Sequence, residues 1–135
     1  MPEKSPLVTD VMQSSFVVID GMATVRDALL QMHEANSDVL IVDKRTDDDE
    51  HGIVLLTDIV SAVLAPNRAP ERVHVYEIMS KPVVTVHSGM SVKNCARLFA
   101  NIGVSAAPVL RDGAIAGIVT YRELAFAHLN NESES

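Results

Sequence analysis

Gly117-Ile118-Val119 is followed four residues later by Glu123-Leu124, and the same order of residue types occurs earlier in the chain as Gly52-Ile53-Val54 followed by Asp58-Ile59. Single apolar residues often agree by chance. Agreement of a glycine, an apolar pair and an acidic position in the same order is much less common. The chain therefore contains an internal repeat, and this repeat decides the fold.

The repetition extends upstream, where residues 11–42 align with residues 78–109 and Thr24-Val25 meets Ser91-Val92. Each copy predicts the same order of elements, β-α-β-β-α, from its apolar runs and its helical periodicity. The predicted strands span residues 16–19, 39–42 and 52–56 in the first copy and 83–86, 107–110 and 114–119 in the second. The predicted helices begin after Thr24 and Ser91, and a final helix covers about 57–65 and about 121–130.

Local signals mark the ends of these elements. Thr24 with Asp27, and Ser91 with Asn94, have the spacing of helix N-caps. Asn36 and Gly103 stand where a left-handed residue would end each helix. Arg111-Asp112-Gly113 predicts a tight hairpin turn, whereas residues 44–51 form a longer, acidic loop at the matching place in the first copy.

The domain organisation follows from the repeat. We expect one repeat over residues 7–65, a linker over 66–73 with two prolines, a second repeat over 74–130, and a frayed, solvated tail over 131–135. A copy of this size buries little surface alone. We therefore expect an α/β (α+β) fold in which the two repeats pack sheet against sheet with pseudo-two-fold symmetry.

Composition excludes several classes of function. The 135 residues carry a formal net charge of −7, which disfavours binding to nucleic acid or to an anionic membrane. One cysteine, Cys95, cannot form an internal disulfide. The sequence shows no signal-peptide pattern and no apolar run long enough to span a bilayer, so we expect a cytoplasmic protein.

Each copy resembles a CBS domain, the family named after cystathionine β-synthase. The resemblance rests on Asp10-Val-Met12 and Glu77-Ile-Met79, on Val104-Ser-Ala-Ala-Pro-Val109, and on Gly117-Ile-Val-Thr-Tyr-Arg-Glu-Leu124. It implies a tandem pair, or Bateman module, with two clefts that bind adenosine compounds such as AMP, ADP, ATP or S-adenosylmethionine. It also implies a homodimer and a regulated partner protein.

The resemblance places ligand-binding residues in two clefts. The preferred cleft would be lined by Ser80, Lys81, Val83, Val104, Ser105, Ala106, Thr120 and Glu123. In this cleft the Thr120 hydroxyl would face a phosphate or the ribose, and Lys81 would contact a phosphate. The Glu123 carboxylate would bind the two ribose hydroxyls. Thr120 and Glu123 equally fit a plain helix capping box.

The second, weaker cleft would use Phe16, Asp38, Val39 and Asp58. In this cleft Leu55 stands at the position of Thr120 and so offers no hydroxyl, and Asp38 would repel a phosphate.

The other conspicuous residues favour ordinary roles. Asp47 to Glu50 lack the alternating ligands of a calcium loop and predict a solvated hairpin tip. The histidines form no metal-binding pair, and Cys95 lies on a core-facing helix stripe. We expect no metal, no required cofactor and no enzymatic activity.

Two hypotheses therefore stay open. The first is a regulatory module that senses an adenine nucleotide or a related adenosine compound. The alternative is a structural module that dimerises or docks on a partner without a nucleotide. The apolar helix faces with Ala28, Leu29, Met32, Ala96 and Phe99 predict a homodimer.

Overall fold

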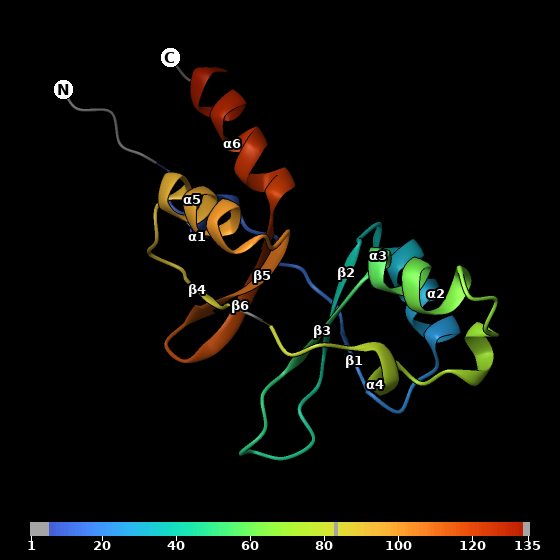
Figure 1. Ribbon diagram of the computed structural model, residues 1–135. Helices are drawn as coiled ribbons and strands as arrows, with labels where there is room; N and C mark the ends of the chain where they lie inside the picture. The colour runs from blue at the N-terminus through green and yellow to red at the C-terminus, as the bar shows by residue number, and fades with distance from the viewer. Residues whose placement is uncertain (1–5, 83, 134–135) are drawn as a thin grey trace. The chain divides into compact units, whose positions relative to one another are not determined.

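A computed structural model describes residues 6–82 and 84–133 and divides the chain into two compact units. The first unit is formed by residues 16–82, and the second by residues 1–15 together with 83–135. Each unit therefore contains a short helix that comes from the other repeat along the chain: α1 (Val8–Val11) in the second unit and α4 (Val75–Ile78) in the first (Figure 1).

Backbone hydrogen bonds hold these exchanged segments in place. In the first unit, the amides of Val75 and Tyr76 donate to the carbonyls of Ala23 and Gly21, at 2.8 and 2.9 Å. In the second unit, the Val8 amide donates to the Met90 carbonyl at 2.8 Å. The sequence repeats and the compact units therefore have different boundaries: the short helix that opens each repeat belongs to the unit formed by the other repeat.

The first unit has a three-stranded sheet in the order β1-β2-β3, with β1 (Val18–Ile19) parallel to β2 (Val39–Val42) and β2 antiparallel to β3 (Gly52–Leu55). Helix α2 (Val25–Ala35) makes the crossover between the parallel strands. The chain then continues through α3 (Leu56–Ile59), a π-helical turn (Val60–Leu64) and a 3-10 turn (Pro70–Arg72).

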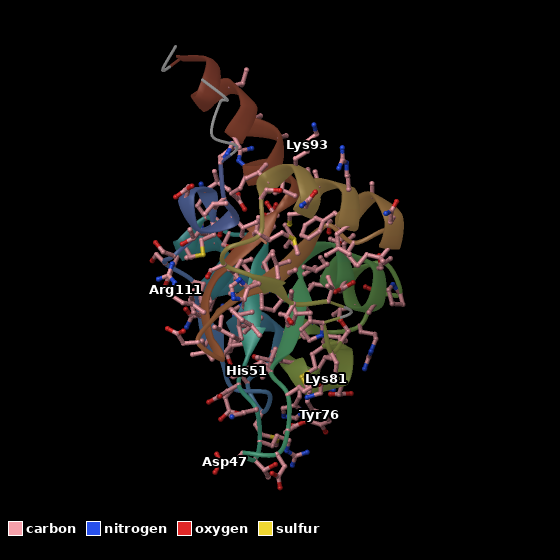
Figure 2. The ribbon with its side chains drawn as sticks, turned by 90° about the vertical axis from the view of Figure 1, so that its left-hand side faces the viewer. Asp47, His51, Tyr76, Lys81, Lys93 and Arg111 are labelled. Atoms are coloured by element: carbon pink, nitrogen blue, oxygen red, sulfur yellow. The ribbon has the colours of Figure 1, made fainter. Side chains whose placement is uncertain are left out.

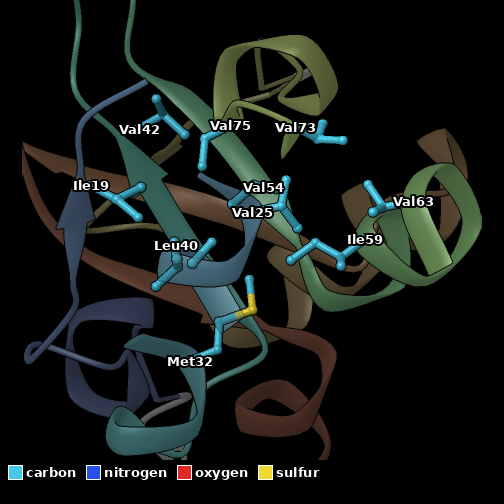
Figure 3. Close-up of a cluster of buried hydrophobic side chains, with 11 residues drawn as sticks. Ile19, Val25, Met32, Leu40, Val42, Val54, Ile59, Val63, Val73 and Val75 are labelled. Carbon is cyan, nitrogen blue, oxygen red and sulfur yellow. The ribbon is translucent and has the colours of Figure 1, made fainter. Parts of the chain in front are cut away.

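The core of this unit lies between the sheet and its helices. All four residues of β2 are buried, which fits a strand covered on both faces. Figure 3 shows the cluster, in which Leu40, Val54, Ile59 and Val63 are fully buried. Burying side chains of this size is worth about 1.5–3 kcal/mol each and supplies the main stabilisation of the unit.

The second unit repeats this arrangement. Its sheet has the order β4-β5-β6, with β4 (Val86–His87) parallel to β5 (Ala106–Arg111) and β5 antiparallel to β6 (Ala114–Thr120). The helices are α5 (Val92–Ile102) and α6 (Tyr121–Ser133). The mixed α/β class and the repeated unit are therefore confirmed; the packing of one unit against the other stays a prediction.

The predicted element ends are largely confirmed. The Thr24 hydroxyl accepts from the Asp27 amide and the Ser91 hydroxyl from the Asn94 amide, both at 3.1 Å. Asn36 and Gly103 adopt left-handed conformations, with φ of 51° and 72°. Asp112 and Gly113 also have positive φ, which is the signature of a two-residue type I′ hairpin.

Some elements differ from the prediction. The opening strands β1 and β4 contain two residues each, because each pairs with its neighbour over two positions only. Helix α6 continues to Ser133, so part of the predicted tail is helical. The final helix of the first repeat starts at Leu56 and widens into a π turn, in which the Ala65 amide donates to the Val60 carbonyl.

The helices are short. Among residues 6–82 and 84–133, none combines the length and the apolar character that crossing a bilayer requires.

Candidate functional site

Each unit brings its predicted site residues together where an antiparallel strand ends and the next helix begins. In the second unit, Ala106 pairs with Thr120 across the sheet, and the Tyr121 amide donates to the Ser105 carbonyl at 3.1 Å. In the first unit, Val39 pairs with Leu55 and the Leu56 amide donates to the Asp38 carbonyl at 2.8 Å. The two sites are therefore built by the same backbone geometry.

The carboxylate of Glu123 is at the centre of the second unit's site. Its Oε1 accepts from the backbone amide of Thr120 at 2.7 Å and from the Thr120 hydroxyl at 3.0 Å. The Thr120 hydroxyl in turn accepts from the Arg122 amide at 3.2 Å. These bonds cap the first turn of α6, as the capping interpretation of this pair predicts.

Gln13 forms a contact with Glu123 that the sequence analysis did not predict. Its side-chain amide Nε2 donates to Glu123 Oε2 at 3.1 Å. Its backbone is fixed against β6, since Gln13 and Ile118 exchange two hydrogen bonds of 2.8 and 3.0 Å. A Cβ on Gly117 would lie 2.7 Å from the Gln13 carbonyl oxygen, so only glycine allows this close approach.

Asp58 occupies the same position in the first unit with fewer contacts. Its Oδ2 accepts from the Leu55 amide at 3.2 Å, which is the bond that corresponds to Thr120 and Glu123. No other hydrogen bond to this carboxylate is formed by the residues that the structure describes. Helix α3 starts at Leu56, so Thr57 lies within its first turn and does not cap it.

Ser80 is the counterpart of Gln13 in the first unit. Ser80 and Ile53 exchange backbone hydrogen bonds of 2.8 and 3.0 Å, just as Gln13 and Ile118 do. Ser80 and Lys81 were predicted to join the cleft with Thr120 and Glu123. They belong to the first unit, whereas Val104, Ser105, Ala106, Thr120 and Glu123 belong to the second.

The Lys81 ammonium is engaged in an ion pair. It lies 2.9 Å from Asp49 Oδ1 and also donates to the Glu50 carbonyl. The hydrogen bond from Lys81 holds the pKa of Asp49 below its ordinary value. The β2–β3 loop is thus tied back at Asp49, while Asp47 lies exposed at its outer end (Figure 2).

The remaining predicted residues divide between sites and core. Phe16 precedes β1 at the end of the sheet where Val39 begins β2, because Val18 lies opposite Ile41 in a parallel pair. Val104 packs against the core of the second unit, which agrees with a structural role. Val83 lies outside the described residues.

A pocket at the other end of the first unit's sheet was not predicted. It has a volume of about 260 Å³ and follows the ends of β1 and β2, beside α4. It is lined by Asp20, Gly21, Met22, Asp43, Lys44, Arg45, Tyr76 and Met79. These residues carry no sequence motif, so only the topology brings them together.

Cys95 is fully buried, and its burial raises the pKa of the thiol to about 11. The thiol is therefore protonated at neutral pH and is a poor nucleophile. In the part of the chain that the structure describes, no three His, Cys, Asp or Glu side chains gather as a metal site.

Comparison with known proteins gives the family. The family model described as "CBS domain" matches residues 8–65 and 75–130. An uncharacterized protein of Methanopyrus kandleri is 31% identical over 96 residues, a match that covers 70% of this chain and 47% of that protein. The chain thus spans about half the length of the curated relative it matches.

Solved structures share the fold over almost the whole chain. A hexameric CBS-CP12 protein from bloom-forming cyanobacteria has a TM-score of 0.86 and 38% identity, covering 92% of this chain and 68% of that one. The CBS domain pair of protein MJ0100, in complex with 5′-methylthioadenosine and S-adenosyl-L-methionine, has a TM-score of 0.79 and 23% identity, covering 94% and 98%. With the family model matching both halves, the chain belongs to the CBS domain family and carries two copies of the domain.

Proposed function

We propose that this protein is a regulatory module that binds an adenosine compound and transmits the bound state to another protein chain. The observation that carries the proposal is the repeated carboxylate. Asp58 and Glu123 each lie in the first turn of a helix that follows a sheet strand. A carboxylate in that place can accept hydrogen bonds from both hydroxyls of a ribose.

The residues around each carboxylate suit a nucleoside. Ser105 and Ala106 in the second unit have short side chains that leave room for a base beside the strand, and Val39 holds the matching position in the first unit. Thr120 and Ser80 are proposed to supply hydroxyl groups, and Lys81 an ammonium group that would first have to leave Asp49. Val83 is proposed with them from its sequence position. CBS pairs related in fold support an adenosine ligand, since one was solved with S-adenosyl-L-methionine and 5′-methylthioadenosine.

In this proposal the module works in the cytoplasm, performs no chemistry and needs no metal or resident cofactor. Its output is a change in contact with a partner protein. No nucleic acid or membrane takes part, because the net charge of −7 opposes binding to either polyanion.

A second candidate function is protein interaction without a nucleotide. Helix α6 supports it, because Tyr121, Phe126 and Leu129 expose 66%, 45% and 58% of their surface. The related CBS-CP12 protein is a hexamer, which shows that a CBS protein of similar sequence can build an assembly. We propose that exposed apolar side chains of this helix contact a second copy of the chain.

Thermal denaturation with AMP, ADP, ATP, adenosine and S-adenosylmethionine tests the nucleotide hypothesis. An open site of this kind suggests a dissociation constant on the order of micromolar to millimolar. At about 100-fold excess over that constant, a bound ligand raises the unfolding free energy by about 2.7 kcal/mol. The double variant Asp58→Asn and Glu123→Gln is expected to lose the shift, whereas the exposed-loop control Asp48→Asn is expected to keep it.

If no adenosine compound shifts the melting temperature at millimolar concentration, the interaction hypothesis replaces the nucleotide hypothesis.

A further inference from the structure

The two units place different side chains beside their equivalent carboxylates. Gln13 and Ser80 are equivalent in the backbone, since each forms two hydrogen bonds with the strand that carries the carboxylate helix: β6 before α6, and β3 before α3. The Gln13 side chain reaches Glu123 with a 3.1 Å hydrogen bond. Among the described residues, the shorter Ser80 side chain forms no hydrogen bond with Asp58.

Within the protein, the Glu123 carboxylate therefore accepts three hydrogen bonds and keeps one of its four acceptor positions, on Oε2. Thr120 donates twice to Oε1, and Gln13 donates to Oε2. A ribose diol needs two acceptor positions on this carboxylate, so it has to displace the Gln13 amide. The displaced amide would lose a hydrogen bond to a charged group, which lowers the affinity of the site.

Asp58 carries no such internal competitor among the described residues. Only the Leu55 amide donates to it, through Oδ2, which leaves Oδ1 open to a ligand hydroxyl. The side chain is half-buried, so it is accessible while still partly shielded from water. The Asp58 carboxylate of the first unit can thus accept hydrogen bonds from a ribose without displacing a protein side chain.

The charges around Asp58 also restrict the ligand. Asp38, whose carbonyl is bonded to the start of α3, adds a second carboxylate, whereas its counterpart Ser105 is neutral. Leu55 stands where the second unit has the Thr120 hydroxyl. Lys81, the nearest cation in the sequence to Ser80, is held by Asp49 and the Glu50 carbonyl. A phosphate at this site would therefore meet a carboxylate that the second unit lacks, and would not find the hydroxyl that Thr120 supplies there.

We propose that the two sites are unequal: the Asp58 site binds adenosine compounds whose 5′ group is neutral or cationic, and Gln13 closes the Glu123 site as an internal competitor. This inference rests on the proposed function, because it assumes that an adenosine compound is the ligand. Beyond the proposed function, the inference names the class of ligand and the unit that binds it. It also names Gln13 as the residue that makes the second unit different.

Isothermal titration calorimetry of the full chain with S-adenosylmethionine tests the proposal. The wild type is expected to bind one equivalent per chain, and Asp58→Asn to weaken that binding at least tenfold. Gln13→Met keeps the side-chain length but removes the amide donor, so it is expected to expose a second equivalent. Gln31→Met, at an exposed position of α2, is the matched control and is expected to leave one equivalent.

The reciprocal variant Ser80→Gln places a carboxamide beside Asp58. It is expected to weaken the wild-type binding event severalfold if Gln13 acts as a competitor at the equivalent place. Melting temperatures measured without ligand show that each variant is folded. The backbone bonds of residues 13 and 80 do not depend on their side chains.

Ligand charge is tested with adenosine and S-adenosylmethionine against AMP and ATP. We expect the unphosphorylated compounds to bind at least tenfold more tightly, and Asp38→Asn to reduce that ratio. Equal binding by wild type and Gln13→Met, or insensitivity to Asp58→Asn, overturns the inequality of the sites. Tighter binding of ATP overturns the ligand class. Only the absence of binding by every variant with every compound overturns the proposed function as well.

Discussion

Gln13 and Ile118 exchange two backbone hydrogen bonds, of 2.8 and 3.0 Å, and so fasten the N-terminal segment to the strand that leads into α6. The bridge brings the chain against Gly117. A Cβ at that position would lie 2.7 Å from the Gln13 carbonyl oxygen and 2.8 Å from Met12 Sδ. The same bridge carries the residue that contacts Glu123, so its geometry sets both the stability of the second unit and the state of its site.

The Gly117→Ala variant is expected to lose about 1–3 kcal/mol of unfolding free energy, because a backbone oxygen cannot move away as a flexible side chain can. Gly52→Ala is expected to cost less, since the atom 2.8 Å from its new Cβ is the thioether sulfur of Met79, which belongs to a flexible side chain. Gly89→Ala, at an exposed position, is the control and should stay within about 0.5 kcal/mol. Urea denaturation measures all three; equal effects at Gly117 and Gly89 would refute the close approach.

The ion pair between Lys81 and Asp49 predicts a pH dependence. The pKa of Asp49 is lowered, chiefly by the Lys81 hydrogen bond, so the ionised form is favoured in the folded state. The stabilisation is present above the ordinary carboxyl pKa and is lost as pH falls through the lowered value. Carbon-detected NMR titration of the Asp49 carboxyl is expected to give a low midpoint in wild type and a higher one in Lys81→Met. An unchanged midpoint in the variant would show that the pair does not form in solution.

Cys95 predicts a loss of stability at high pH. Burial raises its pKa from 9.0 to about 11, so the unfolded thiol ionises before the folded one. The contribution to stability is complete below pH 9 and decreases between pH 9 and 11, by about 2 kcal/mol at the upper end. Chemical denaturation of wild type against Cys95→Ala isolates this effect, because all other groups are shared. Rapid labelling of the native thiol at pH 8 would contradict its burial.

A homodimer is expected, although the residues that suggested it have another role. Ala28, Met32 and Phe99 are buried in the cores of their own units, and Ala96 is exposed. The apolar surface of α6 now supports the prediction, so Phe126→Asp is expected to dissociate the dimer. Light scattering should give twice the chain mass of 14.6 kDa for wild type and for the control Asp48→Asn. A wild-type monomer at micromolar concentration would rule the dimer out.

The features that could be predicted from sequence are those with a local chemical cause. Thr24 and Ser91 cap helices because their hydroxyls reach amides three residues away. Asp112-Gly113 forms its turn because both residues tolerate positive φ. The family motif likewise placed Thr120 and Glu123 together at one helix start.

Other features depend on contacts between distant segments, for which the sequence carries no local pattern. The exchange of α1 and α4 between units rests on backbone bonds, such as that from Val8 to Met90, which any residue type can form. The contact from Gln13 to Glu123 joins residues 110 positions apart, and only the strand bridge beside it makes it possible. The family motif therefore led us to rank the Glu123 site first, whereas the hydrogen bonds are the basis on which we propose Asp58 as the accessible carboxylate.

An NMR titration of the ¹⁵N-labelled chain with S-adenosylmethionine tests the central claim most directly, because it reports binding and location together. The account predicts saturable shifts of the Leu55, Leu56 and Asp58 amides at the first site, with the Thr120 and Tyr121 amides unchanged. In Gln13→Met, the Thr120 and Tyr121 amides should shift as well. Shifts confined to Thr120 and Tyr121 in the wild type, or no shifts at millimolar ligand, would contradict the account.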